Sequence, residues 1–128
     1  MTAEAPSPPT ACPGSDFGTF LDAFAEDPTL QRRYTRLPLP VTTMDEGPDG
    51  PRPLERLLPA DSIPWPVLLS AATRAAEGLE LTIDSTAAGQ WRVTAAKPDT
   101  DYQLEYTFMR DDERGACWYL VRYENASL

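Results

Sequence analysis

Proline is distributed so unevenly along this chain that it limits what each half can fold into. Thirteen of the 14 prolines lie within residues 1–66, and Pro98 is the only one in the remainder of the 128 residues. Proline has no backbone N–H, so it interrupts helices and is excluded from central strands. We therefore expect short helices and irregular segments in the first half, and a regular sheet in the second.

The first half begins with small residues and prolines that offer little surface to bury. Residues 1–14 are predicted to be a disordered leader, and residues 15–128 to form one domain, because this length suits a single hydrophobic core. Within that domain, residues 44–66 contain six prolines and are predicted to form a long loop. Residues 37–43 are expected to be extended, as an edge strand that tolerates its two prolines.

Three helices are predicted in the first 78 residues. Ser15 and Asp16 are both suitable N-caps for the first, and four apolar residues recur after them at helical spacing: Phe17, Phe20, Leu21 and Phe24. Asp27 followed by Pro28 marks the start of a second helix. A third is expected over about residues 62–77, closed by Gly78 in the left-handed conformation.

Period-two patterns and short apolar runs replace the helical pattern after Gly78. They predict four strands, at residues 79–86, 90–96, 102–110 and 116–123. The connections are short and rich in turn residues, which predicts a meander of antiparallel hairpins. Both faces of the last strand are apolar, so we expect it to be central or to lie beneath the proline-rich loop. Helices followed by strands predict the α+β class, with helices on one face of a curved antiparallel sheet of four to six strands.

The absence of histidine excludes several kinds of catalytic and metal site. Without it there is no Ser/His/Asp or Cys/His nucleophilic site and no imidazole ligand, and two cysteines are too few for a Cys-only structural zinc site. Residues 45–50 lack the ligand spacing and the terminal Glu of an EF-hand loop. We therefore predict no metal, no cofactor and no enzymatic activity.

The charge balance favours basic partners. The chain has 20 acidic and 11 basic residues and a formal net charge of −9. Nucleic acids and anionic membrane surfaces attract basic proteins, so neither is expected as a partner, whereas a basic protein would be steered towards this chain. No apolar run approaches the roughly 20 residues that cross a bilayer. Residues 1–9 carry no secretion signal, so we expect either a cytosolic protein or a mature exported form.

Two stretches resemble a known family of bacterial envelope proteins. The first contains Asp16, Phe17, Phe20, Phe24, Asp27, Leu30, Gln31 and Arg33 and continues to Leu37, Pro38 and Leu39; the second is Trp118, Tyr119, Leu120 and Val121. They are similar to the opening and to the last long strand of small envelope proteins with a nuclear-transport-factor-two-like cone. The resemblance spans about residues 16–124 and implies a bent sheet with a helical lid.

The resemblance implies several functions, because members of that superfamily use the cone for ligand pockets, for isomerase or dehydratase chemistry, or for protein contacts. A small, acidic member without catalytic residues resembles an immunity protein, which neutralises an antibacterial toxin delivered by a secretion system. That reading implies a periplasmic location and a basic secreted toxin, encoded nearby, as the partner. The alternatives are a small-ligand carrier and an isomerase-like enzyme.

The envelope location implied by the resemblance gives the two cysteines a role. In an oxidising envelope, Cys12 and Cys117 are expected to form a disulfide that pins the N-terminal segment to the last strand. The alternative is two free thiols, with Cys117 buried in a strand and Cys12 in the leader.

Two acidic clusters and two apolar residues are the candidate partner-binding groups. Asp45, Glu46 and Asp49 belong to the predicted long loop, and Asp111, Asp112 and Glu113 to the last hairpin turn. Charges at the rim of an interface speed association and select the partner, and Leu57 and Trp65 are candidate exposed anchors within that rim. The alternative interpretation of the clusters is solvated loop charge.

An enzyme of the ketosteroid isomerase kind would need a carboxylate base that faces a tyrosine inside an apolar cone. The candidate carboxylates are Asp84 and Asp101, and the candidate tyrosines are Tyr34, Tyr102 and Tyr106. Because tyrosines in strands are more often core residues, we prefer a binding function to a catalytic one.

Overall fold

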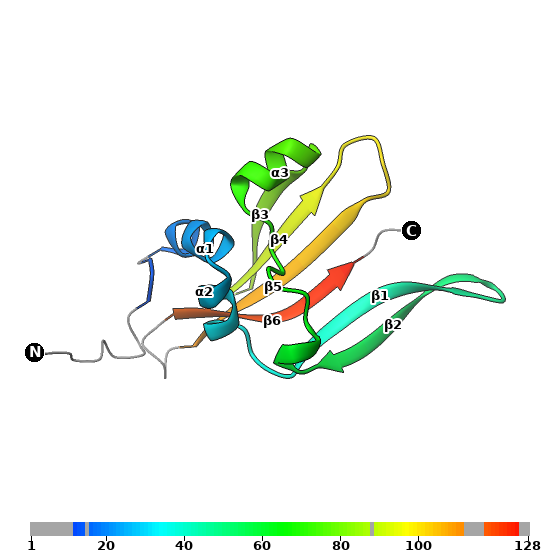
Figure 1. The fold of residues 1–128 in the computed structure, drawn as a ribbon, viewed down its shortest axis with the longest axis horizontal. Helices are drawn as coiled ribbons and strands as arrows, with labels where there is room; N and C mark the ends of the chain where they lie inside the picture. The colour runs from blue at the N-terminus through cyan, green and yellow to red at the C-terminus, as the bar shows by residue number, and fades with distance from the viewer. Residues whose placement is uncertain (1–11, 15, 88, 112–116, 126–128) are drawn as a thin grey trace, which may run out of the picture.

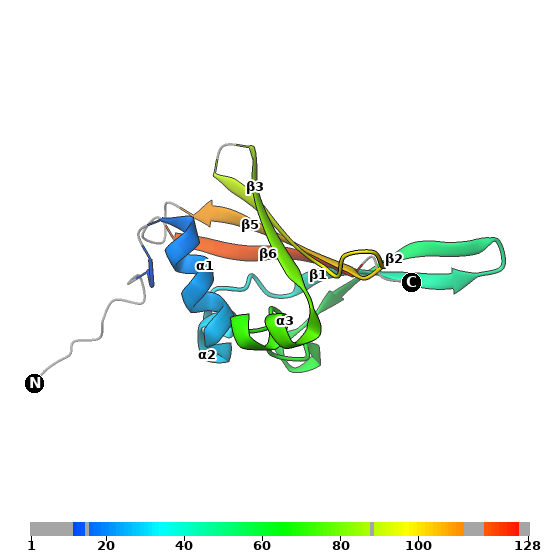
Figure 2. The same ribbon diagram turned by 90° about the horizontal axis from the view of Figure 1, so that it is seen from above.

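The computed structural model describes residues 12–14, 16–87, 89–111 and 117–125. The helices are α1 (Phe17–Glu26), α2 (Pro28–Arg33), the 3-10 helix η1 (Ala60–Ser62) and α3 (Ala71–Glu77). The strands are β1 (Leu39–Gly47), β2 (Gly50–Leu58), β3 (Glu80–Ala87), β4 (Gln90–Ala96), β5 (Gln103–Asp111) and β6 (Cys117–Asn125). Figure 1 and Figure 2 show the helices on one face of the sheet and the β1–β2 hairpin projecting beyond it. The predicted α+β class is confirmed.

The six strands form one mixed sheet in the order β2-β1-β6-β5-β4-β3. The expectation of a purely antiparallel sheet is wrong at one place: β1 and β6 run parallel, with Val41 opposite Tyr123 and Thr43 opposite Asn125. Because β2 to β5 lie between β1 and β6 in the chain, no short turn forces β1 and β6 to be antiparallel. Since β2 occupies the edge, the prediction of residues 37–43 as an edge strand is also wrong. The meander β3-β4-β5-β6 and the central place of β6 are confirmed.

The predicted loop over residues 44–66 is for the most part a β-hairpin. β1 extends to Gly47 and β2 occupies Gly50–Leu58, paired antiparallel along their whole length. Prolines are tolerated in an edge strand where the missing N–H would point away from the neighbouring strand. Pro51 and Pro53 are two residues apart, so their backbone nitrogens point to the same side of β2 and both can face the open edge.

The third helix is shorter than predicted. It covers only Ala71–Glu77, whereas residues 63–70 form an irregular segment. Pro64 and Pro66 disfavour helical geometry in the residues that precede them. In addition, the side chains of Gln31 and Tyr106 form hydrogen bonds with backbone groups that a helix would need for its own hydrogen bonds. The predicted end is confirmed, because Gly78 is left-handed with a φ of 74°.

Both N-terminal helices begin where the sequence predicts. The Asp16 carboxylate accepts the Thr19 N–H at 2.8 Å, which caps α1. The Asp27 carboxylate accepts the Thr29 N–H at 2.9 Å, with Pro28 as the first residue of α2. Each cap satisfies an N–H that has no partner within the helix.

The core is an aromatic cluster between α1 and the sheet. Phe17 stacks on Trp91 with ring centroids 4.9 Å apart, and Phe20 and Phe24 meet the ring of Phe108 edge-on. The three phenylalanines of α1 are at most 4% exposed, as the helical spacing predicts. This packing places α1 on the sheet, and α2 follows directly after it.

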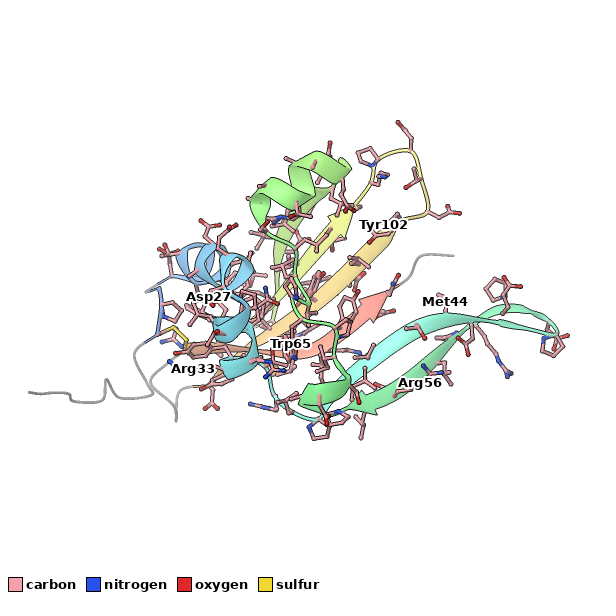
Figure 3. All side chains as sticks on the ribbon, in the orientation of Figure 1. Asp27, Arg33, Met44, Arg56, Trp65 and Tyr102 are labelled. Atoms are coloured by element: carbon pink, nitrogen blue, oxygen red, sulfur yellow. A yellow bond between two sulfur atoms is a disulfide. The ribbon has the colours of Figure 1, made fainter. Side chains whose placement is uncertain are left out.

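Cys12 and Cys117 form the expected disulfide, with Cα atoms 5.5 Å apart across 105 positions of sequence. The bond, yellow in Figure 3, ties the segment before α1 to the start of β6. The rest of the predicted leader, residues 1–11, lies outside the described residues. None of the described helices is long and apolar enough to cross a membrane.

Candidate functional site

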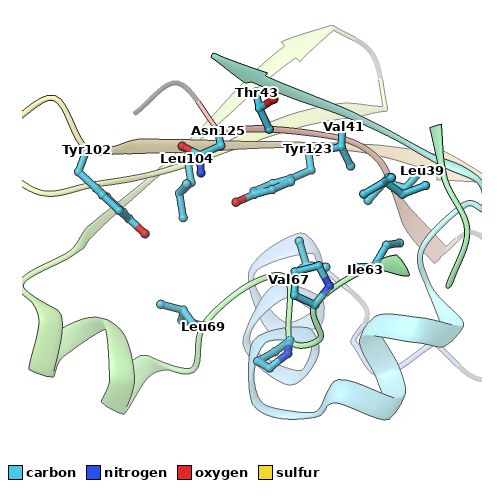
Figure 4. A pocket seen from close by; sticks show the side chains of 13 residues that line it. Leu39, Val41, Thr43, Ile63, Val67, Leu69, Tyr102, Leu104, Tyr123 and Asn125 are labelled. Atoms are coloured by element: carbon cyan, nitrogen blue, oxygen red, sulfur yellow. The ribbon is translucent and has the colours of Figure 1, made fainter. Parts of the chain in front are cut away.

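A cavity of about 430 Å³ lies between the sheet and the segment that joins β2 to α3. We call this segment, residues 59–70, the roof. The sheet lines the cavity with Leu39, Val41, Thr43, Leu58, Leu104, Tyr123 and Asn125, Tyr102 lines it directly before β5, and the roof lines it with Ile63, Pro64, Pro66, Val67 and Leu69. Figure 4 shows these side chains facing the space between sheet and roof. The wall is therefore largely apolar.

Four polar side chains interrupt the apolar wall: Thr43, Tyr102, Tyr123 and Asn125. Burial and, after it, the nearby Tyr102 raise the pKa of Tyr123 to about 12. Its hydroxyl is therefore protonated at neutral pH and can donate as well as accept a hydrogen bond. Tyr102, which is 36% exposed, points its hydroxyl into the cavity in Figure 4. These groups can orient a bound molecule without reacting with it.

One glutamine holds the roof in position. Gln31 of α2 is completely buried. Its amide nitrogen donates to the Leu68 carbonyl at 2.9 Å, and its amide oxygen accepts the N–H groups of Val67 at 2.7 Å and Leu68 at 3.2 Å. The Tyr106 hydroxyl donates to the Val67 carbonyl at 2.9 Å. These two side chains satisfy four backbone groups of the roof, so one wall of the cavity has a fixed backbone.

Trp65 supports the roof instead of projecting from the molecule as an exposed anchor. It is half-buried, and its indole N–H donates to the Ala60 carbonyl at 2.9 Å. The guanidinium of Arg32 lies over its ring, 5.5 Å from the centroid, a cation–π contact. The expectation of an exposed Trp65 is therefore wrong, whereas the other candidate anchor, Leu57 of β2, is 64% exposed.

The structure places Asp111 far from the other acidic cluster. Asp45, Glu46 and Asp49 are exposed near the turn of the β1–β2 hairpin. Asp111 lies at the end of β5, 3.8 Å from the guanidinium of Arg36, and Asp112 and Glu113 lie outside the described residues. The hairpin turn and the end of β5 occupy opposite ends of the molecule (Figure 1). Within the described ranges, no three Cys, Asp or Glu side chains are grouped so that they could hold a metal ion.

The candidate catalytic groups do not meet at the cavity. Asp84 and Asp101 are exposed, and neither lines the cavity. Tyr34 and Tyr106 are buried, and the Tyr106 hydroxyl is engaged with the roof. Of the five, only Tyr102 reaches the cavity, and no carboxylate occurs among the described residues that line it. The described wall thus offers hydrogen-bond donors and apolar surface but no base.

Tyr123 and Asn125 have no sequence signature as site residues. Tyr123 and Asn125 line the cavity together with Val41 and Thr43 because β1 pairs with β6, a contact between distant parts of the chain. Gln31 offers a weak signal, because it is a polar residue beside Leu30 in a helix too short to hold many core contacts. Its partners in the roof are 36 and 37 positions away, so its role depends on the tertiary fold.

No protein-family model and no curated protein matches this sequence. Solved structures that share the fold include two from Bacteroides species. An NTF2-like (nuclear transport factor 2-like) protein from Bacteroides fragilis NCTC 9343 is 23% identical with a TM-score of 0.62, over 90% of this chain and 48% of that one, so this chain spans about half its length. A cystatin-like protein from Bacteroides caccae ATCC 43185 is 21% identical with a TM-score of 0.58, over 88% of this chain and 77% of that one. The chain therefore has an NTF2-like fold.

Proposed function

We propose that this protein is a non-catalytic binding protein whose cavity holds one small, predominantly apolar molecule. The observation that carries the proposal is the open apolar space of about 430 Å³ beneath a fixed roof. Ligand sites are concave, mostly apolar and supplied with a few convergent polar groups, and their volumes run from about 300 to 1,000 Å³. The cavity has each of these properties.

The polar groups of the cavity favour binding over catalysis. Tyr102 and Tyr123 can hydrogen-bond a ligand, but a hydroxyl whose pKa is raised by burial, as in Tyr123, is a poor base at neutral pH. The carboxylates considered for an isomerase, Asp84 and Asp101, are exposed to solvent outside the cavity. Proton abstraction from a bound molecule would need a base at the wall.

A neutral apolar dye, N-phenyl-1-naphthylamine, tests the proposal. We expect saturable binding at one site, seen as dye fluorescence, and a rise in the melting temperature as the dye stabilises the native state. Leu69→Trp, in the roof, should fill the cavity and abolish binding. Leu57→Trp, the same change on the exposed hairpin, should leave it intact. Absence of binding, or equal binding by the two variants, would contradict the proposal.

A second candidate function is inhibition of a protein partner, as in a periplasmic immunity protein that neutralises a basic secreted toxin. The projecting β1–β2 hairpin supports it, because Leu57 and Leu54 are 64% and 36% exposed there and an acidic turn follows β1. Exposed leucines on a hairpin that also carries charge suit an interface with an apolar centre and a charged rim. The disulfide is compatible with an oxidising compartment such as the periplasm.

Calorimetry between this protein and the product of the gene next to its own tests the second candidate. Leu57→Asp on the hairpin should weaken that complex at least tenfold, the loss expected for a buried anchor residue. Ile83→Asp, a matched change at an exposed position of β3, should have little effect. Failure of the wild-type proteins to associate, or equal losses in the two variants, would argue against this function.

A further inference from the structure

The polar side chains of the cavity wall gather towards one of its ends. Strands β1, β6 and β5 are neighbours, and their register places Thr43 beside Asn125 and Asn125 beside Leu104. Tyr102 precedes Leu104 by two residues, so it lies beyond this row on the same side of the sheet. Tyr123 lies one row further in, and Figure 4 shows its hydroxyl pointing towards Tyr102. We call Thr43, Tyr102, Tyr123 and Asn125 the polar end of the cavity.

The opposite end of the cavity is apolar and buried. Leu39 and Leu58 lie opposite each other on β1 and β2, and Leu39 is four residues from Thr43, or roughly 13 Å along the strand. Ile63 of the roof lies near Leu39 (Figure 4). Leu39 is 0% exposed and Ile63 is 6% exposed, whereas Tyr102 is 36% exposed. The polar end is therefore the one that reaches solvent, and the apolar end is enclosed.

The wall offers hydrogen bonds but no charge. None of the described residues that line the cavity is Asp, Glu, Lys or Arg. A charged group that left water for this space would lose its hydration without gaining an opposite charge. A neutral oxygen would exchange its water for the hydroxyls of the polar end, which costs much less. Within the described part of the chain, no hydrogen bond occupies the hydroxyl of Tyr102 or that of Tyr123.

We propose that the ligand is an uncharged amphipathic molecule, with a compact apolar body and one head group that carries a neutral oxygen, a hydroxyl or a carbonyl. The head group lies at the polar end, hydrogen-bonded to Tyr102 and Tyr123, and the body lies against Leu39 and Leu58. This inference rests on the proposed ligand-binding function, to which it adds the chemical class of the ligand and its orientation. The body enters first, because the enclosed end is the apolar one.

Three naphthalenes that differ in one substituent test the class of ligand. Naphthalene has no head group, 2-naphthol has a neutral hydroxyl, and 2-naphthoate is an anion at neutral pH. The concentration at which each displaces N-phenyl-1-naphthylamine gives its affinity. We expect 2-naphthol to bind about fivefold more tightly than naphthalene, the ratio for one net hydrogen bond, and at least tenfold more tightly than 2-naphthoate. Equal affinity for naphthalene and 2-naphthol, or binding of 2-naphthoate as tight as that of 2-naphthol, would overturn the inference.

Variants at the two ends test the orientation. Tyr123→Phe removes one hydroxyl of the polar end and should weaken binding of 2-naphthol about fivefold while that of naphthalene is unchanged. Leu58→Ala trims the apolar end and should weaken both ligands by the same factor. Tyr119→Phe, the same change at a tyrosine that does not line the cavity, should affect neither.

The outcomes separate this inference from the function on which it rests. Equal losses for naphthalene and 2-naphthol in Tyr123→Phe would show that the head group lies elsewhere and would overturn the proposed orientation. If N-phenyl-1-naphthylamine and naphthalene bind to wild type without any preference for 2-naphthol, the inference fails and the proposed function stands. If none of these molecules binds to wild type, the proposed function itself fails.

Discussion

Replacing Gln31 by methionine tests the conclusion that one side chain fixes the roof. Methionine has nearly the same length and volume as glutamine, so the substitution removes three hydrogen bonds without opening a large void. The groups left unpaired are the N–H groups of Val67 and Leu68 and the carbonyl of Leu68, at present bound at 2.7, 3.2 and 2.9 Å. The substitution therefore changes only the hydrogen bonds at this position, where the side chain is 0% exposed.

The expected loss is about 3 kcal/mol in the free energy of unfolding. Each buried backbone group left without a partner costs about 1–3 kcal/mol, and we use the lower limit because the roof can relax towards water. A loss of this size lowers the folding equilibrium constant more than a hundredfold. It also frees the roof backbone, so binding of the neutral dye should weaken in the folded fraction.

Urea unfolding followed by tryptophan fluorescence measures this loss. Gln90→Met is the control, because Gln90 is a half-buried residue of β4 that does not line the cavity, and a change there is expected to stay within about 0.5 kcal/mol. A loss below 1 kcal/mol for Gln31→Met, or equal losses in the two variants, would refute the idea that the glutamine holds the roof.

Two further predictions concern the disulfide and the tyrosines. Cys12→Ser combined with Cys117→Ala should lower the free energy of unfolding by up to about 4.7 kcal/mol, the chain-entropy limit for a loop of roughly 100 residues. Urea unfolding measures this loss, and wild type in the presence of a reductant should lose the same amount. If the variant and wild type are equally stable, the disulfide does not stabilise the protein. Burial raises the pKa of Tyr123 from 10.0 to about 12, so the unfolded state releases this proton first. The contribution of Tyr123 to stability should therefore be full below pH 10 and fall by up to about 1.4 kcal/mol per pH unit between pH 10 and 12. The pKa values of Tyr106 and Tyr34 are also raised, so these residues add to the loss. The melting temperature measured over this pH range should therefore fall less steeply for Tyr123→Phe than for wild type. An identical slope would exclude Tyr123 as a source of the pH dependence.

Local signals account for the parts of the fold that sequence reasoning reproduces. The caps at Asp16 and Asp27 and the left-handed Gly78 depend on neighbours within a few positions, and each is found where expected. The meander is likewise predictable, because short turns connect its strands.

Long-range contacts account for the parts that it misses. The sequence does not predict the β1–β2 hairpin, because Pro51 and Pro53 are compatible with a strand only at the edge of a sheet. The edge position of β2 depends on how distant strands pair. The irregular roof depends on Gln31, whose partners lie 36 and 37 positions further along the chain. A cavity bounded by such contacts has no local pattern in the sequence.

The hydrogen bonds that hold the roof in position affect which substitutions this protein can tolerate. Gln31 and Tyr106 bind backbone atoms of the roof and none of its side chains. Substitutions at Ile63 or Leu69 therefore change the contour of the cavity while the two residues that anchor it keep the same partners. The residues that hold the roof in place and the residues that shape the cavity are therefore different. Relatives or engineered variants can exchange one ligand for another without a change in the fold.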